Sequence, residues 1–293
     1  MIVGTRESRL AMRQTEIFME MLQERCSGTS CEVVTIKSLG DKDLRSPLSG
    51  MGAVGAFVRE LDDALLRKEI DVSVNSLKDI PTTLREGLKI GAVLKRDSPE
   101  DVILPCPLED LPEGAVVGTA SVRREYLLRN MRPDLKIKQL RGNIHTRLSK
   151  LDGGEYDAIV LAKAGLERMG IDRPAFVLDP RVFVPAPAQG TIAVECRDDD
   201  EETISKLLEV NDYVSRLETG AERGIMKFMG AGCSSPVGIN AKYEGDEIRV
   251  RAVSFTYTQE PVRVDTMIPE LYIMDDLLDI ADYLTGKRPR LKL

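Results

Sequence analysis

The fold class follows from the stretch AVVGTASVRREYLLRNM, residues 115–131. Its first part is small or β-branched and predicts a buried strand at 115–119, and the remainder favours a helix at 121–131. A strand followed at once by a helix is the repeating unit of a parallel α/β sheet. The polar turn around Ser121 would lie at the carboxyl end of that strand, where amide groups at the start of a helix attract anions.

The same alternation extends from this stretch in both directions along the chain. Short apolar runs predict further strands near 1–4, 31–37, 71–75, 90–94, 136–140, 157–162 and 191–196. Amphipathic stretches between them predict helices at 8–25, 55–69, 143–152 and 163–169. We therefore expect an α/β protein whose sheets are of the parallel type.

Two segments, 95–99 with one proline and 184–190 with two prolines and a glycine, interrupt the pattern and indicate crossings between two lobes. Because the series of strands and helices between them is complete, we expect lobe 2, residues 98–184, to be inserted into lobe 1. Lobe 1 would consist of 1–94 and 190–210. A separate C-terminal α+β domain is predicted at 212–293, with a helix, three strands and a last helix at 212–229, 237–243, 247–256, 262–266 and 269–285.

Composition narrows the chemistry that the chain can perform. The net charge is −7, yet arginines crowd into residues 121–147. This favours a small anionic ligand over nucleic acid, because nucleic-acid binders carry broad basic faces and stacking aromatics. A lone histidine, His145, argues against a Ser-His-Asp triad and a His-based metal site, and the five cysteines form no CxxC pair. We expect no bound metal.

The first ten residues, MIVGTRESRL, carry charges that interrupt any apolar run. We therefore expect neither a signal peptide nor a membrane span, and a cytoplasmic location. The expected partner is a small-molecule substrate. We expect the chain to act as a monomer, without nucleic acid or membrane.

Polar and cationic groups follow the predicted strands, at 5–8, 76–79, 119–124, 141–143 and 163–165. Ligands of open α/β sheets bind beyond the carboxyl ends of strands, so we expect these groups from both lobes to meet in one cleft. Several of its arginines are suited to bind carboxylates through paired N–H donors, namely Arg123, Arg124, Arg141 and Arg147. The alternative for any one of them is a solvated or ion-paired surface residue.

Two further side chains in these loops are candidates for chemistry. Asp79 follows a buried strand and precedes Pro81. Its carboxylate could accept N–H groups and stabilise positive charge on a substrate, whereas the alternative is a turn residue that bonds its own backbone. Cys233 lies in a Gly-rich loop and could be an attachment point, or an idle thiol. Cys31 and Cys196, inside apolar strands, read as packing residues.

Taken in order, these blocks resemble the motifs of the porphobilinogen deaminase family, from near residue 4 to beyond residue 240. The matching blocks are 4–11 with Gln14, 57–61, 76–81, 118–124, 141–143 with Thr146 and Arg147, 161–162 with 164–166, 189–190, 222–223, and 232–233 with Pro236 and Gly238. Each block alone is weak evidence for the family, but the whole set of blocks in this order is highly specific for it.

The resemblance implies two lobes similar to those of periplasmic binding proteins, followed by a third domain. It implies that Cys233 holds a dipyrromethane primer, made from the substrate itself, through a thioether. Four porphobilinogen molecules would then be joined head to tail onto the primer. Each would lose ammonia, leaving an azafulvene-like pyrrole that joins the free α-carbon of the chain, and hydrolysis would release hydroxymethylbilane.

Roles for individual residues follow from the same resemblance. Asp79 would hydrogen-bond pyrrole N–H groups and stabilise cationic intermediates. The acetate and propionate groups of the primer would be held by Lys78, Ser121, Arg123 and Arg124. Incoming substrate or the growing chain would be bound by Arg6, Ser8, Arg141, Arg147, Arg168 and Gln189.

Four positions depart from the family pattern. Asn75 stands where a His is usual, Val54 where a Lys is frequent, and Ala188 and Ala231 where Gly is usual. The missing Lys weakens the expectation that the loop 40–55 contacts a carboxylate.

The alternative function is a non-catalytic, two-lobed binding protein for a small carboxylate ligand, which would leave the third domain and its Gly-Cys loop without a role. Treating the acidified protein with an aldehyde reagent for pyrroles separates the two, because a bare binder carries no pyrrole. A phosphate-handling transferase is a third interpretation, but the chain lacks both GxxxxGK[ST] and GxGxxG.

Overall fold

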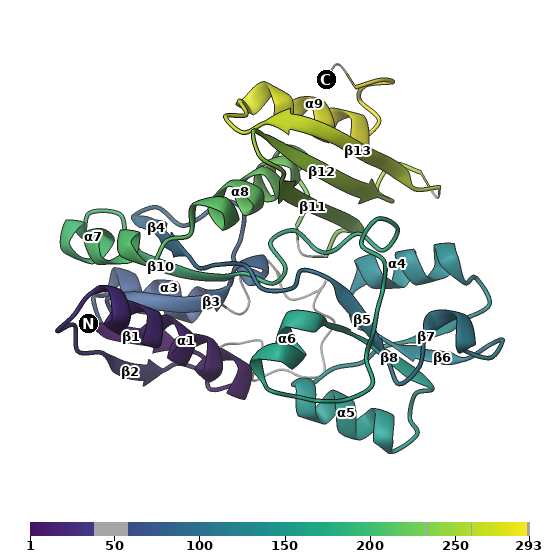
Figure 1. The fold of residues 1–293 in the computed structure, drawn as a ribbon, viewed down its shortest axis with the longest axis horizontal. Coiled ribbons are helices and arrows are strands. Elements are labelled where there is room, and N and C mark those ends of the chain that lie inside the picture. Colours follow the sequence, from purple (N-terminus) through teal and green to yellow (C-terminus); the bar gives the residue numbers. More distant parts are fainter. Residues whose placement is uncertain (38–57, 233, 259, 292–293) are drawn as a thin grey trace. The chain divides into compact units, whose positions relative to one another are not determined.

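The computed structural model describes residues 1–37, 58–232, 234–258 and 260–291 (Figure 1). The chain forms two compact units. Unit 1 contains Met1–Asp97 and Thr191–Leu217, and unit 2 contains Ser98–Gly190 and Glu218–Leu293. Unit 2 therefore combines the predicted lobe 2 with most of the predicted C-terminal domain, and the division into three domains stays a prediction.

A five-stranded sheet with the order β2-β1-β3-β10-β4 forms the centre of unit 1. Two hydrophobic clusters cover it, one with α1 and α7 and one with α3, because each helix has an apolar stripe to bury. The strands are β1 (Ile2–Thr5), β2 (Glu32–Thr35), β3 (Val72–Ser76), β4 (Leu88–Val93) and β10 (Ile192–Arg197). The helices are α1 (Arg9–Arg25), α3 (Arg59–Leu66), α7 (Glu201–Glu209) and the 3-10 turn η2 (Leu77–Asp79).

Unit 2 contains a second five-stranded sheet, with the order β7-β6-β8-β5-β9. Its strands are β5 (Asp101–Leu104), β6 (Val116–Gly118), β7 (Lys136–Lys138), β8 (Ala158–Ala162) and β9 (Phe176–Val177). Its helices are α4 (Val122–Met131), α5 (Ile144–Asp152), α6 (Lys163–Arg168) and the 3-10 turn η3 (Leu108–Asp110). The stretch 115–131 thus forms the strand and helix that its pattern predicts.

The two sheets are mixed, whereas the sequence pattern predicts parallel ones. β10 runs antiparallel to β3 and β4, and β5 runs antiparallel to β8 and β9. Both reversed strands directly follow a predicted crossing segment. In the unit 1 sheet, β10 begins beside the end of β4, where Ala193 pairs with Val93, so it runs back antiparallel to β4.

The remainder of unit 2 is a three-stranded antiparallel sheet, β11-β12-β13, with α9 packed on β12 and β13 (Figure 1). These elements, with the preceding helix, are α8 (Tyr213–Phe228), β11 (Val237–Tyr243), β12 (Glu247–Ser254), β13 (Val262–Pro269) and α9 (Met274–Leu284). α9 begins later than the predicted 269–285 because β13 continues to Pro269. Val253 and Phe255 belong to the same hydrophobic cluster as Val117 and Leu127, which explains why the two sheets form one unit.

None of the helices in the described part of the chain is both long enough and apolar enough to cross a membrane.

Candidate active site

One group of candidate site residues belongs to unit 1, at the edge where β1 and β3 end. These strands are parallel neighbours, with Val3 paired to Val72. The residues that follow them therefore emerge at the same edge, and these residues include four predicted site residues, Arg6, Ser8, Lys78 and Asp79. The topology thus brings together the two motifs, 5–8 and 76–79, that lie 71 positions apart in the sequence.

Local hydrogen bonds hold these two motifs in place. Ser8 caps α1, its Oγ accepting the N–H of Ala11 at 3.2 Å. The side-chain amide of Gln14 donates to Ser76 Oγ at 2.8 Å and ties α1 to the end of β3. Asp79 is half-buried and closes η2, whose first residue, Leu77, is buried in the core.

Asn75, the departure from the usual His, is a buried residue of the unit 1 sheet. Its side-chain amide donates to Ser73 Oγ and to Glu195 Oε2, both at 3.1 Å. The amide thus supplies hydrogen bonds to a buried carboxylate, which would be costly to leave unpaired. Asn75 therefore links β3, the strand before Asp79, to the buried Glu195 on the neighbouring strand β10.

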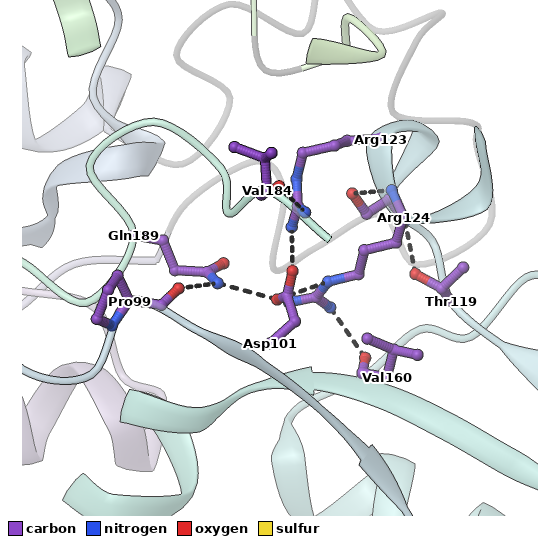
Figure 2. Close-up of polar contacts among 9 residues, drawn as sticks. Pro99, Asp101, Thr119, Arg123, Arg124, Val160, Val184 and Gln189 are labelled. Atoms are coloured by element: carbon purple, nitrogen blue, oxygen red, sulfur yellow. Dashed lines mark hydrogen bonds and ion pairs between the residues drawn. The ribbon is translucent and has the colours of Figure 1, made fainter. Parts of the chain in front are cut away.

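A second group of candidate residues, within unit 2, contains two arginines that share one carboxylate (Figure 2). Arg124 donates from Nε and Nη2 to Asp101 Oδ1 at 3.1 and 2.7 Å, and Arg123 donates from Nη2 to Oδ2 at 2.7 Å. Their Nη1 atoms donate to the main-chain oxygens of Val184, at 2.8 Å from Arg123, and Val160, at 2.9 Å from Arg124. The side chains are 4%, 8% and 0% exposed for Arg123, Arg124 and Asp101.

The topology of the unit 2 sheet explains why the side chains of Asp101, Arg123 and Arg124 lie together. β5 begins at Asp101, which pairs with Ala162 at the end of β8. β6 and β8 are parallel, so α4 begins at the same edge. Its N-cap is Ser121, whose Oγ accepts the N–H of Arg124 at 3.4 Å. The predicted helix start beside Ser121 is therefore confirmed.

The positive charges of the two arginines keep the Asp101 carboxyl ionised. Burial would raise the pKa of Asp101, but the adjacent guanidinium groups of Arg123 and Arg124 outweigh burial and lower the pKa to about 2. Two cations and one anion leave a net positive charge on the cluster. Arg123 Nε is buried and has no hydrogen-bond partner among the described residues. The cluster therefore suits an additional anionic group.

Gln189 belongs to this cluster rather than to an open surface. It is buried, and its Nε2 donates to Asp101 Oδ1 at 2.9 Å and to the main-chain oxygen of Pro99 at 2.8 Å (Figure 2). The segment that carries it is held by Glu222, which accepts the N–H of Ala188 at 2.5 Å. Ala188 has a φ of 60°, a conformation that favours glycine, which explains why Gly is usual there.

The other predicted arginines of unit 2 follow β7 or lie on the short helices. Arg147 on α5 donates from Nε to the oxygen of Gly142 at 2.7 Å, and Arg141 lies directly before that glycine. Arg168 closes α6 and donates to the oxygen of Gly190 at 2.7 Å. Each is half-buried and so accessible to a ligand.

The cysteines divide as follows. Cys233 lies outside the described residues, as does Val54. Cys196 is buried in the unit 1 core, and burial raises the pKa of its thiol to about 11. A thiol of that kind is unreactive at neutral pH, which agrees with a packing role.

Gly238 offers a test of the packing behind Arg123. A methyl group at this position would lie 2.5 Å from the oxygen of Val184, the atom that accepts the Arg123 hydrogen bond. We expect Gly238→Ala to lower the free energy of unfolding by about 1–3 kcal/mol, as overpacking does. Urea denaturation measures it. At Gly232 an added methyl meets no described atom within 4 Å, so Gly232→Ala should leave stability nearly unchanged, and equal losses would contradict the prediction.

Comparison with known proteins shows which family the chain resembles. Residues 1–205 match the family described as porphobilinogen deaminase, dipyromethane cofactor binding domain, and residues 217–264 match the porphobilinogen deaminase C-terminal domain. A probable porphobilinogen deaminase of Methanosarcina acetivorans is 47% identical, covering 98% of this chain and 93% of that protein. The porphobilinogen deaminase of Oceanobacillus iheyensis is 41% identical, covering 96% of both chains.

The solved structures found to be similar share much less sequence with this chain than these relatives do. A nutrient binding protein from Burkholderia cenocepacia bound to methionine is 15% identical, with a TM-score of 0.44, covering 71% of this chain and 90% of that one. The sequence matches extend over most of the chain and include both the strand-edge motifs of unit 1 and the arginine cluster of unit 2. The chain therefore belongs to the porphobilinogen deaminase family.

Proposed function

We propose that this chain is a transferase that joins four porphobilinogen molecules head to tail onto a covalent dipyrromethane primer, releasing ammonia and hydroxymethylbilane. Membership of the family supports the reaction. The observation in the structure that carries the proposal is the buried pair of arginines with one carboxylate between them. A site for a polycarboxylate needs such an excess of buried positive charge.

The described residues fit a carboxylate-bearing primer. Arg123 and Arg124 leave one positive charge uncompensated in the cluster, and Arg123 Nε lacks a partner among the described residues. When bound, the dipyrromethane supplies the free pyrrole carbon to which new rings are joined. Its carboxylates would be held by Lys78, Ser121, Arg123 and Arg124, and its attachment point would be Cys233.

Asp79 would act on the reacting rings. Its carboxylate closes the turn after β3 and is half-buried, so it can accept hydrogen bonds from pyrrole N–H groups. As ammonia leaves the substrate, positive charge develops on the ring that remains. A fixed carboxylate stabilises that charge more than water does, because it needs no reorientation.

The remaining site residues would bind the substrate and the growing chain. Every added ring brings two carboxylates, and each must be neutralised as it leaves water. The residues proposed for this task are Arg6, Ser8, Arg141, Arg147, Arg168 and Gln189. Gln189 would act from within the cluster, since its amide nitrogen already bonds Asp101.

We also propose a cytoplasmic location. The four cysteines that the structure describes are all free thiols, which is typical of proteins in a reducing compartment. Porphobilinogen is the one partner that the proposed reaction needs. Nucleic acid, a membrane or a second copy of the chain plays no part in it.

The intact mass of the purified protein tests the proposal. We expect the wild-type chain to be heavier than its sequence by two linked pyrrole units and Cys233→Ser to lack this excess, because serine does not form the thioether. Cys196→Ser is the matched control and should keep the excess mass. A wild-type protein of unmodified mass that nevertheless makes hydroxymethylbilane would contradict the proposal.

A further inference from the structure

Asp101 is a buried carboxylate that none of the sequence motifs contains. It is the first residue of β5, its side chain has no exposed surface, and its two oxygens accept four hydrogen bonds (Figure 2). We propose that Asp101 is a positioning residue that holds Arg123 and Arg124 in the orientation that the primer requires. This inference rests on the proposed function, in which the two arginines bind the primer.

The hydrogen-bond geometry fixes both guanidinium planes. Arg124 presents two neighbouring nitrogens, Nε and Nη2, to the same oxygen of Asp101, and its Nη1 donates to Val160. Arg123 is held at two points, by Asp101 and by Val184. A planar guanidinium that is bonded at two or three of its nitrogens has no freedom to rotate. The N–H groups that remain therefore have set directions.

Charge is the second reason that the arginines depend on Asp101. Arg123 and Arg124 are adjacent in sequence, and both are buried. Two like charges in a low-dielectric interior repel strongly and are poorly hydrated. The carboxylate between them offsets one of the two charges. Without it, we expect the guanidinium groups to turn towards water and abandon their present directions.

Gln189 extends this arrangement to the chain segments around the cluster. Its amide nitrogen bridges Asp101 Oδ1 and the main-chain oxygen of Pro99. The carboxylate is thereby tied to both predicted crossing segments, since Pro99 ends one and Gln189 lies in the other. Gln189 therefore helps to fix the position of the carboxylate that holds the arginines.

The test replaces Asp101 by Asn, which keeps its size and removes its charge. The intact mass of the folded, purified protein gives the fraction of chains that carry two linked pyrrole units. We expect Asp101→Asn to lower this fraction about ten-fold or more, the effect of losing one charged hydrogen bond. Asp101→Glu, which keeps the charge, should recover part of it.

Asp279 provides the matched control for stability. It is a buried aspartate on α9, in the same unit, and it pairs with Arg288. We expect Asp279→Asn to lower the urea midpoint as Asp101→Asn does but to keep the primer on every chain. If both variants lost primer in proportion to their stability, the positioning role would be wrong.

The arginine variants separate this inference from the proposed function. If Arg123→Leu and Arg124→Leu lack the primer while Asp101→Asn carries it fully, Asp101 is not a positioning residue. If all three variants carry the primer fully, the assignment of the arginines to the primer is wrong, and the inference falls with it. Loss of primer in all three, with the Asp279→Asn control intact, supports both.

Discussion

Replacing Asp79 with Asn is expected to lower the turnover number by about 10²- to 10³-fold, the usual cost of removing one preorganised electrostatic group. The amide has the same size and still accepts hydrogen bonds, but it carries no charge to stabilise a cationic pyrrole. Leu77 anchors the turn in the core, so the backbone around position 79 should not change. Ammonia release measures turnover, and intact mass should show the primer still in place.

Asp71 is the matched control for this prediction. It precedes β3 at the opposite edge of the same sheet, and its Oδ2 accepts the N–H of Ile2 at 2.7 Å. Asp71→Asn should reduce stability slightly and leave turnover unchanged. Near-normal ammonia release by Asp79→Asn would reject the electrostatic role, and an equal loss in both variants would point to a general effect of removing charge from unit 1.

Periodicity was sufficient to predict most elements of this fold. The strand and helix at 115–131 appear as β6 and α4, and the N-cap at Ser121 is as predicted, because capping and burial depend on near neighbours in sequence. β5 escaped prediction because it is a run of four residues between Pro99 and Pro105. The predicted direction of β10, as a strand of a parallel sheet, was wrong, since strand direction depends on how the chain crosses between sheets.

The candidate site was likewise predicted only in part from the sequence. Motif order placed Arg123 and Arg124 at a helix start, and the structure agrees. Sequence could not reveal that their partner is Asp101, because this contact joins residues 22 and 23 positions apart through strand pairing. One local signal was available. A charged residue directly before the apolar run 102–104 begins a buried strand, and a buried charge requires a partner.

The arginines should separate into two classes when each is replaced by Leu. Arg123→Leu and Arg124→Leu each remove one partner of the buried Asp101 and should cost about 3–5 kcal/mol of stability. We expect both variants to be purified largely without the primer. Arg141→Leu and Arg147→Leu should keep the primer, because these half-buried residues would meet incoming rings instead. Each lost charged hydrogen bond should slow a step roughly ten- to hundred-fold.

Native mass spectrometry after a short pulse of porphobilinogen counts the rings on each variant. Arg141→Leu and Arg147→Leu should accumulate chains that carry one, two or three extra pyrroles. Arg132 at the end of α4 is the control, because it bonds Asp134 and the oxygens of Leu108 and Leu111 in a purely structural arrangement. Arg132→Leu should lose stability yet keep both the primer and normal turnover.

The distribution of charge explains why two classes are expected. Arg123 and Arg124 are desolvated before any ligand arrives, and Asp101 offsets only one of their two charges. An anion that stays bound throughout the cycle relieves this imbalance permanently, which suits the primer. A half-buried arginine such as Arg147 is still partly hydrated, so it can bind and release carboxylates as rings are added. If all four variants had the same primer occupancy and the same series of masses, burial would not sort the arginines by role.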